Sequence, residues 1–231
     1  MLRRHLLSLL LLLLPSAAPA AERRVDLSSF QKLRVEGGFV VTLTTAPSPR
    51  GTLSGDAEAL RQVETRIADG TLVVRRVTAG EPSRRTATTP LTLTLAAPPL
   101  SAITVIGGAQ VSAQALRGAA MAVTITGGGD VRVDRVEGDQ LNAMLLGTAR
   151  LSIAGGRVGK ARLAGNGAIA LAAEGLEAGD LSVTLDGPGE IQARARYSAT
   201  VTNGGVGRVT VAGTPKCRIM PGSGPVRCGT R

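Results

Sequence analysis

The middle of the chain repeats one short pattern at a regular interval. It reads GGAQVSA at residues 107–113, GGGDVRV at 127–133 and GTARLSI at 147–153. In each copy the fourth and sixth residues after the leading glycine are apolar, and the residue between them is Ser or Arg. Such period-two alternation is typical of a strand with one buried face, and the glycine indicates a sharp corner before it.

Aligning the whole chain on such glycines gives seven corners at nearly even spacing. Apolar residues recur two positions before each corner, with Asn203 as the exception, and again four and six positions after it. Because two short strands and two turns cannot bury an apolar face alone, neighbouring units must stack. The sequence therefore predicts an all-β fold, a β-solenoid or β-helix-like stack of glycine-cornered coils over about 100–231. The predicted corners are Gly107, Gly127, Gly147, Gly165, Gly187, Gly205 and Gly222.

The region before residue 100 lacks this register but also predicts strands, which makes it an irregular N-terminal β cap of about 21–99 on a single domain, 21–231. Asp69-Gly70 between two apolar runs predicts a β-hairpin. Residues 56–60 are expected to form one helical turn. A longer helix over 57–68 remains open, because its apolar residues also share a helical face. A polar loop is expected over 78–90.

The cap and the repeats together resemble a known family. The chain contains the motif Phe30-x-x-Leu33-x-Val35-x-Gly37, then DGTLVV at residues 69–74, and then the glycine-cornered strands. This order is similar to the head GIN domain family of "putative auto-transporter adhesins", over about Phe30 to Cys228. The resemblance implies a β-helix-like domain of unknown function in exported bacterial proteins, and it implies no catalytic residue.

Residues 1–20 have the features of a secretory signal peptide. Arg3 and Arg4 precede the apolar run Leu6–Leu14, and Ala18-Pro19-Ala20 supplies a small-residue cleavage site. The run is shorter than the roughly 20 residues that span a bilayer, so cleavage is favoured over retention as an anchor. We expect a periplasmic or secreted bacterial protein that begins at Ala21, with no lipid anchor and no transmembrane segment after cleavage.

The inventory of reactive side chains argues against most enzyme chemistry. The single histidine, His5, lies in the expected leader, so histidine bases, Ser/His/Asp triads and histidine-ligated zinc are excluded from the mature chain. The sequence predicts no catalytic residue, no metal and no cofactor. The favoured function is a noncatalytic, adhesin-like or envelope-associated binding or structural module.

A carbohydrate-active enzyme is the alternative, because β-helices host polysaccharide lyases and hydrolases that use carboxylates. Two close carboxylate pairs could serve such an enzyme: Asp130 with Asp134, and Asp186 with Glu190. Residues 127–131 superficially resemble a calcium-binding turn, but no neighbouring repeat places an acid at the same corner, so calcium is not expected.

Charge is unevenly distributed along the chain. Without Arg3 and Arg4, 25 Lys and Arg face 17 Asp and Glu, a net charge of +8. Residues 163–193 hold five acids and no base, whereas residues 191–231 hold seven bases and no acid. Since export makes nucleic acid an unsuitable partner, the basic excess is expected either to be solubilising surface charge or to bind an anionic envelope polymer, lipid headgroups or an acidic protein surface. The candidate basic surface comprises Arg194, Arg196, Arg208, Lys216 and Arg218.

Cys217 and Cys228 lie on either side of the last predicted corner. In an exported chain two cysteines at such a corner are expected to form a disulfide. The bond would hold the final coil, whose outer edge has no following neighbour. A redox role is disfavoured, because the spacing differs from Cys-x-x-Cys. Neither the sequence pattern nor the charge predicts an oligomeric state.

Overall fold

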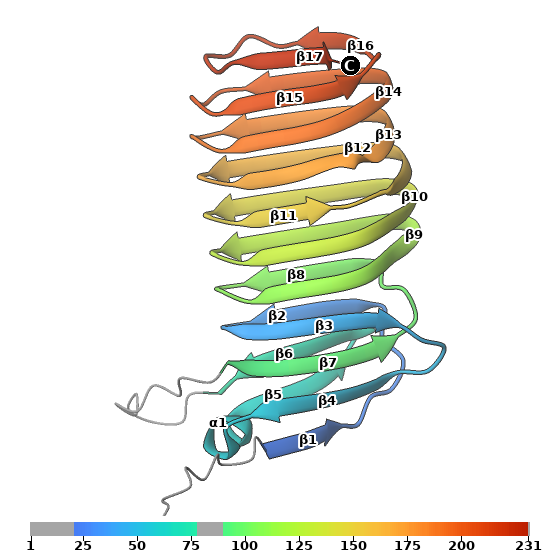
Figure 1. Ribbon diagram of the computed structural model, residues 1–231, viewed down its shortest axis with the longest axis vertical. Helices are drawn as coiled ribbons and strands as arrows, with labels where there is room; N and C mark the ends of the chain where they lie inside the picture. Colours follow the sequence, from blue (N-terminus) through green and yellow to red (C-terminus); the bar gives the residue numbers. More distant parts are fainter. Residues whose placement is uncertain (1–20, 78–89, 231) are drawn as a thin grey trace, which may run out of the picture.

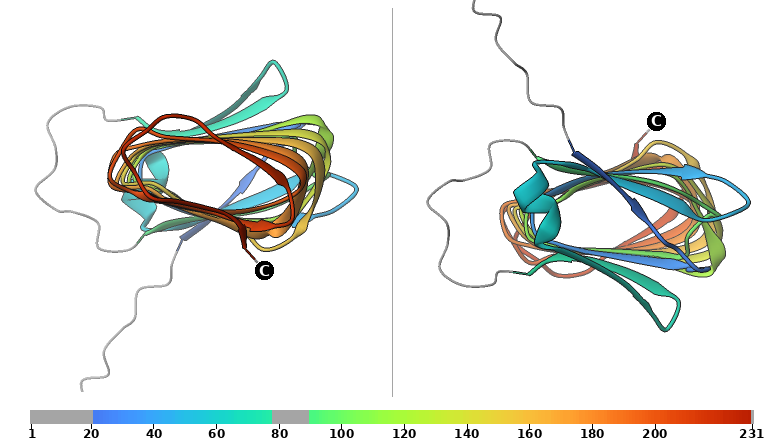
Figure 2. Two further views of the ribbon diagram at one scale, coloured as in Figure 1. Left: turned by 90° about the horizontal axis from the view of Figure 1, so that it is seen from above. Right: turned by 90° about the horizontal axis from the view of Figure 1, so that it is seen from below.

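A computed structural model describes residues 21–77 and 90–230 of the chain. The expected signal peptide and most of the polar loop lie outside these residues. The described chain is a β-solenoid of about six turns, tall and narrow in Figure 1 and oval in cross-section in Figure 2. Its elements are β1 (Ala21–Val25), β2 (Lys32–Glu36), β3 (Phe39–Thr45), β4 (Arg50–Gly55), α1 (Ala57–Arg61), β5 (Val63–Ala68), β6 (Thr71–Arg76), β7 (Leu91–Ala97), β8 (Ala102–Ile106), β9 (Gln110–Gly127), β10 (Asp130–Gly147), β11 (Arg150–Ile153), β12 (Gly156–Gly167), β13 (Ala170–Asp186), β14 (Glu190–Asn203), β15 (Arg208–Gly213), β16 (Lys216–Ile219) and β17 (Val226–Thr230).

Two walls of parallel strands enclose the core. The front wall of Figure 1 contains β3, β7, β11, β15 and β17, and the rear wall contains β2, β6, β8, β12 and β16. The long strands β9, β10, β13 and β14 belong to both walls, because each bends from front to rear at the right-hand edge of the view. We call this edge the bend edge. The opposite edge holds the glycine corners.

Successive coils pair in register through most of the repeat. Val131 pairs with Val111 below and with Leu151 above, and Leu151 pairs with Leu171. These side chains are buried, as the period-two alternation predicts. The same cluster of buried side chains continues without a break from Val25 to Val211.

The fourth corner is at Gly167, so the prediction of Gly165 was wrong by two residues. Gly167 pairs with Gly147 and has a φ of +102°, a backbone conformation that favours glycine. Gly165 instead lies in the inward column, where the coils below and above have Leu145 and Leu185. The side chain of Ile169 fills the space that Gly165 leaves, 2.8 Å from the position of a Cβ added there. The alignment failed because two glycines lie two residues apart, and because Ile169 supplies the aliphatic side chain that Gly165 lacks.

The N-terminal region is irregular, as expected, because its coils do not stack in sequence order. The coil of β2 and β3 lies between β6 and β7 on one side and β8 and β9 on the other. Beyond it, β4 pairs antiparallel with β7, and β1 pairs antiparallel with β4. The chain thus returns beneath its first coil and closes that end of the stack with α1 and β1 (Figure 2).

The hairpin and the single helical turn of the cap are confirmed. β5 and β6 pair antiparallel around Asp69 and Gly70, whose φ values are 50° and 67°, and the hairpin projects from the oval in Figure 2. The carboxylate of Asp56 accepts hydrogen bonds from the first backbone N–H groups of α1, which ends at Arg61. The alternative of a longer helix over 57–68 was wrong, because every residue from Val63 to Ala68 pairs with β6.

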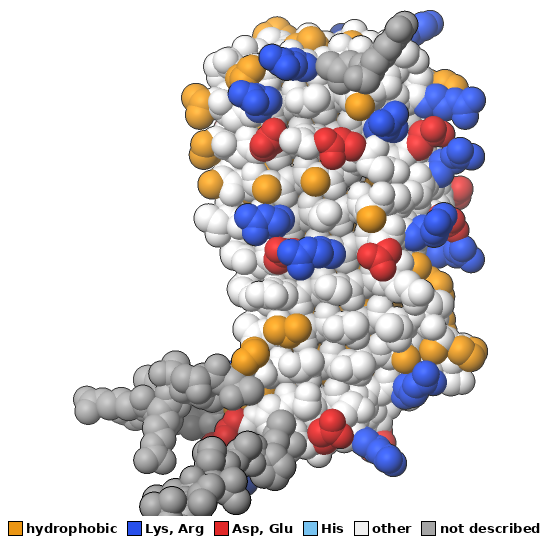
Figure 3. All heavy atoms as spheres, viewed as in Figure 1, with side chains coloured by type: hydrophobic (Ala, Val, Ile, Leu, Met, Phe, Trp, Pro, Cys, Tyr) orange, Lys and Arg blue, Asp and Glu red, His pale blue; other side chains and the backbone are white. Residues whose placement is uncertain are grey.

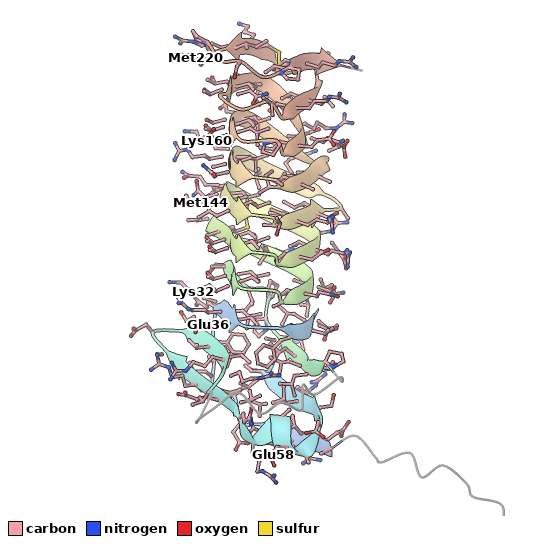
Figure 4. The ribbon with its side chains drawn as sticks, turned by 90° about the vertical axis from the view of Figure 1, so that its left-hand side faces the viewer. Lys32, Glu36, Glu58, Met144, Lys160 and Met220 are labelled. Atoms are coloured by element: carbon pink, nitrogen blue, oxygen red, sulfur yellow. A yellow bond between two sulfur atoms is a disulfide. The ribbon has the colours of Figure 1, made fainter. Side chains whose placement is uncertain are left out.

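The opposite end is held by a disulfide, as predicted. Cys217 on β16 and Cys228 on β17 are bonded, with their Cα atoms 6.2 Å apart, and the bond is the yellow link at the top of Figure 4. It joins the two walls at the last coil. Below it Asn203, the only fully buried polar side chain of the described chain, donates from Nδ2 to the carbonyls of Gly207 and Pro225. The bond to Pro225 connects the last coil to the coil beneath it, and the bond to Gly207 closes the corner between β14 and β15.

Candidate functional site

The bend edge displays a ladder of alternating charge that climbs one coil at each step. The register places Glu137 between Arg117 below and Arg157 above, and it places Glu177 above Arg157. Arg117 donates to the carboxylate of Glu137, and Nε of Arg157 donates to Oε1 of Glu177 over 3.1 Å. Arg196 completes the ladder, with its Nη1 3.9 Å from Oε1 of Glu177. Blue and red side chains accordingly interleave along this edge in Figure 3.

The two arginines beside Glu137 affect the titration of its carboxyl group. Hydrogen bonds from Arg117 and then from Arg135 stabilise its charged form and lower the pKa of its carboxyl group below the usual value. A glycosidase acid needs the opposite, a raised pKa that keeps its proton near neutral pH. Glu137 is therefore suited to hold a fixed negative charge in the ladder.

An open groove of about 400 Å³ runs along the bend edge, beside the ladder. Its floor includes Gly138, Gly159 and Gly179 from three successive coils. Glycine is required where these coils meet, since a Cβ on Gly179 would lie 2.6 Å from the carbonyl oxygen of Gly159. On the far side, Asp180 accepts a hydrogen bond from Oγ of Ser198. The other lining residues are Glu137, Arg157, Val158, Glu177, Arg196 and Tyr197.

A β-bulge puts Tyr197 over this groove. Between β13 and β14 the register shifts, so that Arg196 and Tyr197 together face the single residue Gly179. Cδ2 of Tyr197 lies 3.5 Å from the position of a Cβ added to Gly179, and Tyr197 is 59% exposed. Cζ of Arg196 lies 5.0 Å from the centroid of the tyrosine ring. Bulges commonly re-aim side chains in this way next to functional sites.

The five residues of the predicted basic surface separate into two groups. Arg194 and Arg196 belong to the bend edge, where Arg194 donates to the carbonyl of Glu174 and Arg196 approaches Glu177. The other three lie on the last coils, exposed and with no ion pair to any described residue, and Arg227 on β17 joins them. We call this second group the basic collar, and blue nitrogen atoms lie on both sides of the top end in Figure 4. It comprises Arg208, Lys216, Arg218 and Arg227.

The acidic and basic segments of the sequence lie in stacked coils. Residues one coil apart are neighbours here, so Glu177 of the acidic segment faces Arg196 of the basic one. This is the one ion pair between the two segments over the described residues, so the acids and bases of the two segments remain largely unpaired with each other. In the described chain no coil lies above β16 and β17, which carry Lys216, Arg218 and Arg227, and Arg208 lies one coil lower on β15. None of the four has an ion-pair partner among the described residues.

Neither predicted carboxylate pair lies in the groove. Oδ2 of Asp130 lies 3.2 Å from Nη2 of Arg132 and 3.6 Å from Nη1 of Arg150. Asp186 accepts from the amide of Asn166. Over residues 21–77 and 90–230, no cluster of three or more His, Cys, Asp or Glu side chains forms that could hold a metal ion. The geometry therefore offers the carbohydrate-active alternative no support at the residues named for it.

None of the helices in the described residues is long and apolar enough to cross a membrane.

Comparison with known proteins agrees with the fold. Residues 29–215 match the sequence model of a family described as "Putative auto-transporter adhesin, head GIN domain". No curated protein matches the chain. The description of the family names adhesins.

Solved structures of three bacterial proteins share the fold. A "putative adhesin" from Bacteroides fragilis has a TM-score of 0.82 at 20% identity, covering 92% of this chain and 98% of its own. A "putative adhesin" from Parabacteroides distasonis has a TM-score of 0.67 at 15% identity, covering 91% and 97%. A "putative lipid binding protein" from the same species has a TM-score of 0.62 at 15% identity, covering 93% and 96%. At these identities the likeness concerns the fold alone.

Proposed function

The chain belongs to the family of head GIN domains of "putative auto-transporter adhesins", and from this premise we propose that it is a noncatalytic, exported binding module of the cell envelope. Its partner is an anionic envelope polymer, held by the basic collar. The leader at residues 1–20 supports export to the periplasm or beyond.

The observation that carries this proposal is the contrast between cations that have a carboxylate partner and cations that have none. Arg117 and Arg157 on the bend edge have carboxylate partners one coil away, whereas Arg208, Lys216 and Arg218 have none among the described residues. Residues 191–231 also hold no acid, so the cations of the collar create a local positive potential that attracts a polyanion and orients it toward that end.

The collar also suits a polymer better than a single small anion. Its cations lie on both walls of the solenoid, with Arg208 on β15 at the front and Arg218 on β16 at the rear. The side chains are exposed, and no enclosed pocket separates them from solvent. A flexible chain with charge at each repeat contacts several such sites at once, and each weak contact adds to the avidity.

The test is binding of the chain 21–231 to immobilised polygalacturonate, a carboxylated polysaccharide, at low and high salt, followed by cosedimentation with purified cell-wall and outer-membrane fractions. Because exposed charges are screened by salt, we expect the affinity to fall about tenfold or more between roughly 0.05 M and 0.5 M NaCl. The triple variant Arg208→Glu, Lys216→Glu, Arg218→Glu should lose binding at low salt.

A matched control separates the collar from net charge. Lys32, Arg50 and Arg66 are also exposed and have no ion pair in the described chain, but they lie in the N-terminal region. Their triple reversal to Glu changes net charge equally and should reduce binding far less. Equal losses of affinity in the two triple variants would show that binding depends on net charge and not on the collar, which would contradict the proposal. Failure of the chain to bind either polygalacturonate or any envelope fraction would also contradict it.

A further inference from the structure

Tyr197 is the only aromatic side chain exposed on the described surface. The two other aromatic residues, Phe30 and Phe39, are buried in the core of the N-terminal region. Nothing in the core needs Tyr197, since its neighbours Ala195 and Ala199 are the residues that point inward on this stretch of β14. The β-bulge of β14 therefore exposes an aromatic ring at the end of the groove without a packing benefit.

The groove beside this ring is rich in fixed hydrogen-bonding groups. Arg157 on β12 and Arg196 on β14 supply planar donors, and Glu177 on β13 between them supplies an acceptor. Asp180, also on β13, supplies a second acceptor. Neighbouring strands are about 4.8 Å apart, so Arg157, Glu177 and Arg196 recur at about that interval parallel to the solenoid axis. Lys160 points outward on the adjoining rear wall, as Figure 4 shows.

We propose that this groove binds an uncharged glycan chain that runs parallel to the solenoid axis. The apolar face of one sugar ring stacks on Tyr197, and hydroxyl groups of the following rings bond to the Arg and Glu side chains of successive coils. The glycine floor lets the chain approach the backbone of Gly159 and Gly179. This site is separate from the basic collar, and the inference does not rest on the function proposed for the collar.

The charges in the groove favour a neutral ligand. Two guanidinium groups and three carboxylates, those of Glu137, Glu177 and Asp180, line it, so a polyanion meets as much repulsion as attraction. A peptide that binds by adding a strand needs an open sheet edge. The groove offers none, because β10, β12, β13 and β14 are already paired with each other at this point.

The chain carries its own probe for this site. It has one tyrosine and no tryptophan, so its intrinsic fluorescence reports on Tyr197 alone. The experiment titrates the protein 21–231 with laminarin, dextran, xylan and galactomannan and follows tyrosine emission. We expect a saturable change with at least one of these glycans that persists from roughly 0.05 M to 0.5 M NaCl, because no net charge is involved.

Variants assign the signal to the groove. With the responding glycan immobilised, Tyr197→Ala should bind at least about tenfold more weakly, while Tyr197→Phe, which keeps the ring, should bind within about threefold of the original chain. The collar triple variant should bind the glycan normally, and Tyr197→Ala should bind polygalacturonate normally. No saturable response to any of the four glycans, or a response that Tyr197→Ala leaves unchanged, overturns the inference. Because Tyr197 is exposed, circular dichroism of both variants should match the original chain.

Discussion

The middle coils and the last coil of the solenoid are stabilised in different ways. Between β8 and β13 each coil has the register of the coil below, a continuous apolar core, and charges that pair across coils at the bend edge. In the last coil the buried core ends at Val211, and the residues of β16 are all exposed. There a disulfide connects the two walls, and the hydrogen bond from Asn203 to the carbonyl of Pro225 connects the last coil to the coil beneath it. The cations of the collar have no ion-pair partner among the described residues.

This difference shows how a repeat protein can separate stability from binding. A middle coil is fixed by two neighbours, so a change in its corner or core weakens its contacts with both of them. A terminal coil has one neighbour, so it needs a covalent bond to stay ordered, and its free side is available for a partner. The predictions below begin with the middle coils, where the expected effect is largest.

Gly167→Val should cause the largest loss of stability. The φ of Gly167 is +102°, and a Cβ there would lie 2.4 Å from the carbonyl oxygen of Gly147. Backbone strain and overlap together should lower the free energy of unfolding by about 4 kcal/mol, measured by urea denaturation. Gly108→Val is the matched control, because a Cβ at Gly108 meets nothing within 4 Å. If both variants lose equally, the corner glycines are not what sets the close stacking of the middle coils.

Ile169→Ala should cost about 3.5 kcal/mol, because Gly165 beside it offers no side chain to fill the cavity. Gly165→Leu alone should also destabilise, by about 2 kcal/mol, since the new side chain meets Ile169. The double variant restores the arrangement of the neighbouring coils, where Leu145 and Leu185 occupy the inward column. It should therefore be more stable than Ile169→Ala. Simple additivity of the two losses in urea denaturation would contradict this exchange of side chains.

Removing the disulfide with Cys217→Ser and Cys228→Ser should loosen only the last coil. The two cysteines are 11 residues apart in sequence, and loss of their bond should favour local opening by about 2.5 kcal/mol in the chain-entropy account. Trypsin should then cut after Lys216 and Arg218 about fifty- to a hundredfold faster. Cleavage after Arg132, in the middle coils, should stay slow. Faster cleavage at both places would mean that the middle coils also depend on the disulfide.

The smallest effect concerns pH. Since the folded pKa of Glu137 is lowered, its ion pairs stabilise the fold above the usual carboxyl pKa, and this contribution is lost as pH falls through the lowered value. A side-chain NMR titration of Glu137 should show the lowered pKa. Arg117→Ala should raise it toward the usual value, while the distant Arg66→Ala should not change it. An unchanged titration in Arg117→Ala would remove Arg117 as the cause.

Period-two alternation was sufficient to predict the two walls and the buried ladders, and local motifs and spacing predicted the hairpin and the disulfide. The alternation misplaced the fourth corner, because two glycines lie two residues apart there and either could be the corner. With Gly165 as the corner, Ile169 falls on an aliphatic position of the repeat, so the wrong alignment fitted equally well. The ladder on the bend edge was readable in principle, because Arg and Glu alternate at the same spacing as the corner glycines. The exposure of Tyr197 could not be predicted from the sequence, because it depends on a β-bulge that period-two alternation does not reveal.

The most direct test of the central claim is an NMR titration of isotope-labelled protein 21–231 with polygalacturonate at low salt, with backbone amide shifts assigned along the chain. If the last coil is the binding end, the shifts should move mainly in β15, β16 and β17 and should reverse when salt is added. Shifts concentrated in the middle coils or in the N-terminal region would contradict the account.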